Sequence, residues 1–121
     1  MTARLRVLIV DDERYNRELV QRTLARHVDV LVASDLAEAL AACAAVAIDV
    51  VVTDQRLGRG AETGTELARR LRVATPQARI ILVTGYVDDA AVIAARRDGV
   101  IDDVLAKPYA PGALRARVLG R

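Results

Sequence analysis

The stretch "VLIVDDERYN", residues 7–16, places four apolar residues directly before three acidic ones, Asp11, Asp12 and Glu13. A short apolar run of this kind is typical of a strand that is buried on both faces, and the acids stand where that strand would end. Like charges at a strand end repel one another. We therefore expect a helix cap, a metal ion or a partner to compensate them.

Similar runs rich in Val, Ile and Leu recur along the chain. They occupy residues 6–10, 28–33, 49–53, 79–84 and 102–106. Each run is too short for a helix and too continuous for a strand with one solvated face, so we interpret all of them as buried strands.

Helical patterns fill the segments between these strands. They cover residues 13–27, 35–45, 64–74, 88–98 and 110–119. Thr63 and Glu66 form a capping-box pattern before the third helix, and Asp88 and Gly99 bracket the fourth. The alternation predicts an α/β fold, a doubly wound five-stranded parallel sheet flanked by five helices. We find no linker or repeat, so we expect a single domain over residues 1–121.

Composition excludes several function classes. Lys and Arg number 18 against 16 Asp and Glu, and the cations are scattered rather than clustered. This is weak evidence for nucleic-acid binding, which we do not expect. No apolar run approaches the roughly 20 residues of a membrane span. We expect a cytoplasmic protein that binds no membrane.

Two isolated residues have structural interpretations. Cys43 lies among helical alanines and predicts a small buried side chain rather than a nucleophile. His27 ends the first predicted helix, where a cation is favourable, and no second His or Cys lies nearby. Neither residue indicates a site.

Doubly wound sheets bind ligands outside the carboxyl ends of their strands, where the strand order reverses. For a five-stranded order of 2-1-3-4-5, that point lies between the first and third strands. Asp11 and Asp12 end the first predicted strand and Asp54 ends the third. The three carboxylates should therefore converge.

Thr84 and Lys107 end the fourth and fifth strands on the same rim. Three close carboxylates call for a hard cation with oxygen ligands, and Mg²⁺ suits a shallow site because it retains waters. Asp54 is then a candidate nucleophile toward phosphorus, while Lys107 and the metal hold phosphoryl oxygens and Thr84 donates a hydrogen bond. Each residue alone has an ordinary interpretation as a cap, turn or surface residue. Their joint occurrence at separate strand ends favours a site.

This ordered set of an acidic pair, Asp, Thr and Lys-Pro resembles the receiver domains of two-component response regulators over essentially all 121 residues. The resemblance implies a flavodoxin-like, CheY-like fold with strand order 2-1-3-4-5. It also implies a signalling phosphoacceptor rather than an enzyme that acts on free substrates. A histidine kinase or phosphotransfer protein would phosphorylate Asp54 with the help of Mg²⁺. The domain would then switch conformation to control a partner or an output domain outside this chain.

Position by position, the resemblance makes Asp12 a direct Mg²⁺ ligand, Asp11 a ligand through water and Arg56 a ligand through its backbone carbonyl. Thr84 would engage the phosphoryl group and Lys107 would bridge to it. Pro108 would follow a cis peptide bond.

The chain also departs from the family pattern. Val104 replaces the aromatic residue that commonly takes part in the conformational switch. Gly58 stands where proline is common, and Gly64 comes two residues later than usual, so the loop after Asp54 is longer and is expected to be mobile or to serve a partner. Arg56 and Tyr86 occupy the positions that tune access of water to the phosphoaspartate. Because both are bulky, we predict slow autodephosphorylation.

A dimer is possible through the fourth helix, fifth strand and fifth helix, the face that often carries the output signal in this family. Charged residues there could form salt bridges across it, although a solvated surface is the simpler interpretation. The residues concerned are Asp88, Asp89, Asp102, Asp103, Arg96, Arg97, Arg115 and Arg117.

Two other functions compete with the receiver. A small phosphatase or phosphotransferase could use an aspartyl intermediate, but the haloacid dehalogenase type needs a second acid where Arg56 stands. A pseudo-receiver would bind partners without phosphorylation, which the complete set of acids, Thr and Lys argues against.

Overall fold

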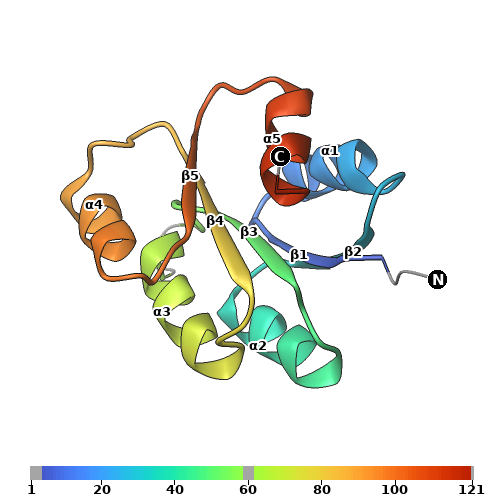
Figure 1. Cartoon of the computed structure of the whole chain (residues 1–121), viewed down its shortest axis with the longest axis horizontal. Coiled ribbons are helices and arrows are strands. Elements are labelled where there is room, and N and C mark those ends of the chain that lie inside the picture. Colours follow the sequence, from blue (N-terminus) through green and yellow to red (C-terminus); the bar gives the residue numbers. More distant parts are fainter. Residues whose placement is uncertain (1–3, 59–61, 121) are drawn as a thin grey trace.

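The computed structural model describes residues 4–58 and 62–120, in which five strands alternate with five helices (Figure 1). The strands are β1 (Arg6–Val10), β2 (Asp29–Ala33), β3 (Val50–Asp54), β4 (Arg79–Thr84) and β5 (Asp103–Ala106). The helices are α1 (Arg14–Leu24), α2 (Leu36–Ala45), α3 (Gly64–Ala74), α4 (Ala90–Arg97) and α5 (Pro111–Val118).

The strands form one parallel sheet in the order β2-β1-β3-β4-β5, as predicted. Val10 of β1 is paired with Thr53 of β3, so Asp11 follows on β1 where Asp54 follows on β3. Thr84 of β4 is paired with Ala106, directly before Lys107. The register therefore brings the predicted site residues to one edge of the sheet.

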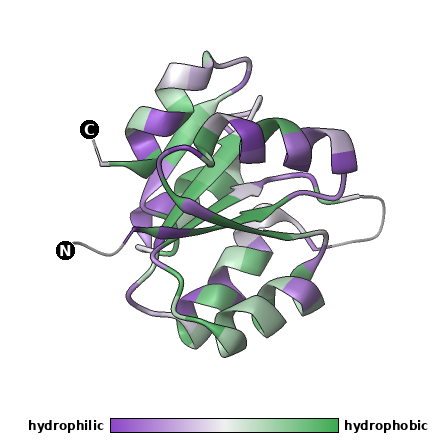
Figure 2. Cartoon of the chain, turned by 90° about the vertical axis from the view of Figure 1, so that its right-hand side faces the viewer, coloured by the Kyte–Doolittle hydropathy of each residue, from purple (hydrophilic) through white to green (hydrophobic). Residues whose placement is uncertain are grey.

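Helices cover both faces of the sheet, with α1 and α5 on one side and α2, α3 and α4 on the other (Figure 1). Alternate residues of β1 enter different cores: Leu8 and Val10 pack toward α2 and α3, and Val7 and Ile9 toward α1 and α5. Figure 2 shows the apolar sheet enclosed between helices that carry polar residues. Burial on both faces explains why β1, β3 and β4 are continuously apolar. The prediction of buried strands was wrong for β2 and β5, which lie at the edges of the sheet and are partly exposed. Within the described ranges, no helix has the length and apolar character needed to span a membrane.

Helix boundaries follow side-chain caps where caps exist. The predicted capping box is present, since Thr63 Oγ1 accepts from Glu66 N–H and Glu66 Oε1 accepts from Thr63 N–H, both at 3.2 Å. The predicted range for α4, residues 88–98, was two residues too long at its start and one at its end. Asp89 rather than Asp88 is the N-cap and accepts from the Ala91 N–H. Gly99 follows α4 with a φ of +74°, a conformation that favours glycine.

His27 and Cys43 differ in detail from their predictions. The first helix ends at Leu24, so His27 lies in the turn after it rather than at the helix end. Cys43 is half-buried and packs against the core beneath α2 and α3. Partial burial raises the pKa of its thiol, which agrees with an unreactive packing role.

Candidate functional site

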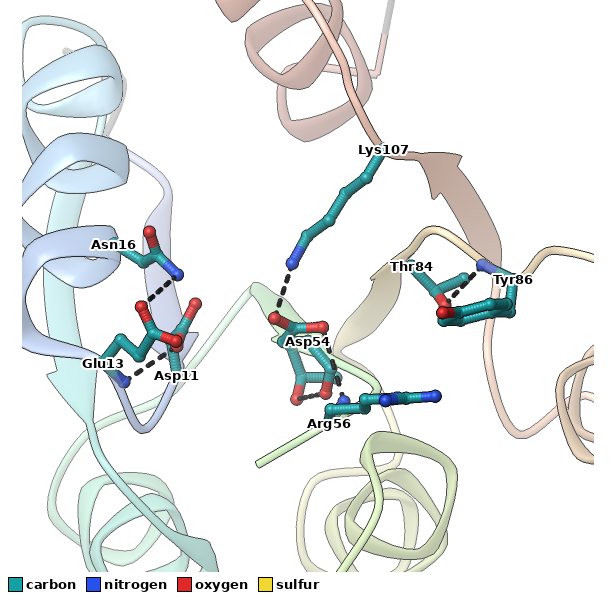
Figure 3. Close-up of polar contacts among 9 residues, drawn as sticks. Asp11, Glu13, Asn16, Asp54, Arg56, Thr84, Tyr86 and Lys107 are labelled. Atoms are coloured by element: carbon teal, nitrogen blue, oxygen red, sulfur yellow. Dashed lines mark hydrogen bonds and ion pairs between the residues drawn. The ribbon is translucent and has the colours of Figure 1, made fainter. Parts of the chain in front are cut away.

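Asp54 and Lys107 meet at the centre of the edge formed by the strand ends. Lys107 Nζ lies 2.6 Å from Asp54 Oδ2, and the Arg56 N–H donates to Asp54 Oδ1 at 3.4 Å (Figure 3). The Asp54 side chain is only 14% exposed, whereas the Lys107 side chain is 38% exposed, so the carboxylate is shielded and the ammonium group still contacts water. Pro108 follows a cis peptide bond with Lys107, as predicted. The ammonium group is therefore held directly beside the Asp54 carboxylate.

Asp11 lies beside this pair but is turned toward the start of α1. It is 8% exposed, and its Oδ1 accepts from the Glu13 N–H at 3.0 Å (Figure 3). Burial raises the pKa of the Asp11 carboxyl, and the nearby charges of Asp54 and Asp12 raise it further. The Glu13 hydrogen bond and the Lys107 charge act in the opposite direction. The charged form of Asp11 is therefore less favourable here than in an unfolded chain.

Asp12 faces a different hollow from Asp11. Asp12 and Asp54 line a cavity of about 750 Å³, whereas Asp11 lines a neighbouring hollow of about 490 Å³ between α1 and α5. Asp54 and Lys107 belong to both. Consecutive residues at a strand end diverge in this way because side chains alternate in direction. The acids thus gather at one edge without pointing into one space.

Gly58 forms part of the wall next to Asp12. Its φ is +112°, and a Cβ there would lie 3.2 Å from Asp12 Oδ2. Proline is locked near −65° and does not fit this backbone. The departure from the family pattern at this position therefore has a conformational cause.

The acids and nearby carbonyls match the chemistry of Mg²⁺. In residues 4–58 and 62–120, no three His, Cys, Asp or Glu side chains form a group that could hold a metal ion. Mg²⁺ needs no such cage, because it takes one or two carboxylates and keeps several waters. Burial raises the pKa of Asp11 most, and repulsion from Asp54 and Asp12 adds to it; such a cation would offset this repulsion. The residues present therefore fit Mg²⁺.

Thr84, Arg56 and Tyr86 form the opposite wall of the larger cavity (Figure 3). Thr84 is buried, and its Oγ1 accepts from the Tyr86 N–H at 3.0 Å, which leaves its hydroxyl hydrogen to donate. The Arg56 guanidinium lies 4.8 Å from the centre of the Tyr86 ring, within the range of a cation–π contact. This contact joins the loop after β3 to the loop after β4.

Val104 and the acids near it lie away from this cavity. Val104 is half-buried and packs against the core of the α2, α3 and α4 face. Asp103 pairs with Arg117 at 2.5 Å, and Asp102 pairs with Arg72 at 2.7 Å. These acids already have cationic partners in their own chain, so their role in salt bridges across a dimer stays a prediction.

Sequence reasoning did not single out three residues that line the larger cavity. Asn16 donates to Glu13 Oε2 at 3.3 Å, Glu62 pairs with Arg70 at 3.9 Å, and Gln55 bonds to the start of α3. None belongs to a sequence motif, and each lines the cavity only because the tertiary fold places it there. Of the long loop expected to be mobile or to serve a partner, residues 59–61 lie outside the described residues.

The model of the response regulator receiver domain family matches residues 7–119. The chain belongs to this family. The response regulator protein PilR of Pseudomonas aeruginosa is 35% identical over 117 residues, which cover 96% of this chain and 26% of PilR. The chain spans less than half the length of the curated relatives it matches.

Solved receiver structures agree with the fold. A response regulator from Burkholderia pseudomallei, with a phosphorylated aspartic acid and a calcium ion, matches with a TM-score of 0.81 and 31% identity, covering 93% of this chain and 65% of that one. The chemotaxis protein CheY4 of Vibrio cholerae matches with a TM-score of 0.82 and 26% identity, covering 98% of each chain. The CheY-like fold predicted from the sequence is therefore confirmed.

Proposed function

We propose that this receiver domain accepts a phosphoryl group on Asp54 from a histidine kinase or phosphotransfer protein, in a reaction that requires Mg²⁺. One carboxylate oxygen of Asp54 bonds to phosphorus as the bond from phosphorus to the donor nitrogen breaks. The electron pair of that bond stays with the histidine ring, and an aspartyl phosphate results. The observation that carries the proposal is the Lys107 ammonium group 2.6 Å from the Asp54 carboxylate, at an edge that also holds Asp11 and Asp12.

The surrounding residues have complementary roles in this proposal. Asp12 would bind Mg²⁺ directly, Asp11 through water, Asp54 through a carboxylate oxygen and Arg56 through its carbonyl. Mg²⁺ would supply positive charge to the equatorial oxygens of the transferring group. Lys107 would replace its contact with Asp54 by one with the phosphoryl oxygens, and Thr84 would donate its hydroxyl hydrogen to another. The structure of the Burkholderia relative contains a phosphorylated aspartic acid and a calcium ion, which supports a site for phosphate and a divalent cation in this family.

Phosphorylation would then change the affinity of the domain for an output domain or effector, in the cytoplasm. Because Val104 is aliphatic, the switch would proceed without an aromatic side chain at that position. The length of the relatives supports an output domain outside these residues. The face of α4, β5 and α5 is the candidate surface for a homodimer.

Incubating the chain with acetyl phosphate, with and without Mg²⁺, tests the function. We expect a mass gain of one phosphoryl group that requires Mg²⁺ and is absent in Asp54→Asn. Beryllofluoride should bind under the same conditions. Turnover of small phosphate esters would favour a phosphatase instead, and no adduct under any condition would favour a pseudo-receiver.

Arg56 and Tyr86 are proposed to limit access of water to the phosphoaspartate. Their cation–π contact spans one wall of the cavity, so either substitution should open that wall. We expect Arg56→Asn and Tyr86→Ala each to speed loss of the phosphoryl group several-fold in a time course. The double variant should decay little faster than the faster single variant, because the two residues share one contact. Unchanged decay in both single variants would contradict this role.

A further inference from the structure

Gln55, which directly follows Asp54, joins the end of β3 to the beginning of α3. Its side-chain Oε1 accepts from the Thr65 N–H at 2.9 Å, and its Nε2 donates to Thr65 Oγ1 at 3.3 Å. Its backbone carbonyl accepts from the Gly64 N–H at 2.8 Å. Thr65 is 4% exposed, so these bonds are sheltered from water. One residue thus holds the first two residues of the helix.

The helix start that Gln55 holds lies against the backbone of Asp54. A Cβ on Gly64 would lie 2.3 Å from the Asp54 carbonyl oxygen and 2.7 Å from Leu82 Cδ1. Only glycine allows so close an approach. Any movement of the first turn of α3 therefore changes the packing against the Asp54 backbone.

The capping box of α3 adjoins these bonds at one point, where Thr63 Oγ1 lies 3.1 Å from Thr65 Oγ1. Thr63 and Glu66 satisfy the N–H groups of the helix terminus without a bond between Glu66 and Gln55. The capping box stabilises the helix itself, whereas Gln55 fixes the helix to the strand that carries Asp54. The two roles can be separated by substitution.

We propose that Gln55 is a positioning residue for phosphoryl transfer to Asp54, and this inference rests on the function proposed above. Its side-chain amide closes the base of the long loop after β3 and keeps the first turn of α3 against the Asp54 backbone. The Asp54 carboxylate and the Arg56 carbonyl are thereby held in place. Gln55 itself acts through the backbone and bonds to no transferring atom.

The matched variants are Gln55→Met and Glu66→Ala. Met has nearly the same length as Gln but cannot form the amide hydrogen bonds, so it removes the bonds to Thr65 and keeps the packing. Glu66→Ala removes one half of the capping box and leaves Gln55 intact. Thr65→Val is a milder third variant, because it keeps the bond from the Thr65 N–H to Gln55 and removes only the two bonds of Thr65 Oγ1, those with Gln55 Nε2 and Thr63 Oγ1. Urea unfolding of each variant shows which retain the fold.

The measurement is the rate of Asp54 phosphorylation by acetyl phosphate at saturating Mg²⁺, together with the Mg²⁺ affinity. Small displacements of reacting groups cost up to about a hundredfold in rate, so we expect a loss of about tenfold in Gln55→Met and a smaller loss in Thr65→Val. Glu66→Ala should react like the wild type even where its stability falls. Equal rates in Gln55→Met and the wild type, or equal losses in Gln55→Met and Glu66→Ala, would overturn the proposal. Absence of phosphorylation in the wild type would instead refute the proposed function and, with it, this role.

Discussion

Lys107→Met is expected to lower the rate of Asp54 phosphorylation by acetyl phosphate about a hundredfold at saturating Mg²⁺, since loss of one preorganised donor costs about 10²–10³ in rate. The Lys107 ammonium lies 2.6 Å from Asp54 Oδ2, so it has only to exchange this contact for one with the transferring oxygens. A fall of this size corresponds to about 2.7 kcal/mol of transition-state stabilisation.

A matched control separates this local effect from a change in net charge. Arg22 is exposed near the end of α1 and lines neither hollow of the site, so Arg22→Met removes one positive charge far from the chemistry. We expect its phosphorylation rate to equal that of the wild type. Lys107→Arg retains the charge but not the compact ammonium group, and it should react at an intermediate rate. A Lys107→Met rate within twofold of wild type would show that Mg²⁺ alone supplies the positive charge.

The central strands were predictable from sequence because burial on both faces leaves a continuous apolar run. β1, β3 and β4 are of this kind, and their order followed once the family pattern was recognised. Helix ends were predictable where a side chain caps them, as at Thr63. The start of α5 was less clear, because its N-cap residue Ala110 offers no capping side chain. The prediction extended that helix by one residue at each end.

The sequence predicted which strand-end residues lie at the site, but not the directions in which their side chains point. The register brings Asp11 and Asp54 to the same edge, yet Asp11 and Asp12 line different hollows. Gln55 escaped notice because a single glutamine forms no motif. Its contacts depend on where the start of α3 lies relative to the end of β3, and no local sequence pattern predicts that position.

Asp11→Asn is expected to stabilise the metal-free chain at neutral pH, by about 1 kcal/mol, the usual scale for relieving an unfavourable functional residue. Asn retains an oxygen that can accept the Glu13 N–H, so the turn into α1 should persist. What it removes is a buried charge close to Asp54 and Asp12. The gain therefore comes from lost repulsion rather than from a new contact.

The pH dependence follows from the raised pKa of Asp11, whose ordinary value is 3.8. Between that value and the higher pKa of the folded state, the folded chain binds more protons than the unfolded chain. The stability of the wild type therefore declines as pH rises through the folded pKa. Wild type and Asp11→Asn should show their smallest difference below the ordinary value and the largest near neutrality. Urea unfolding in EDTA across this range measures the difference.

Mg²⁺ should reverse the order of stability of the wild type and Asp11→Asn. A cation at a hundred times its dissociation constant stabilises a folded chain by about 2.7 kcal/mol, and loss of an outer ligand typically weakens metal binding about 10–100-fold. The wild type should then be the more stable protein in Mg²⁺, and Asp11→Asn the more stable one in EDTA. Asp35→Asn is the control, because Asp35 accepts from a backbone N–H at the start of α2 in a comparable way but lies outside the site. Should Asp11→Asn be less stable than wild type in EDTA and respond equally to Mg²⁺, Asp11 would be a turn residue at the start of α1 and not part of a metal site.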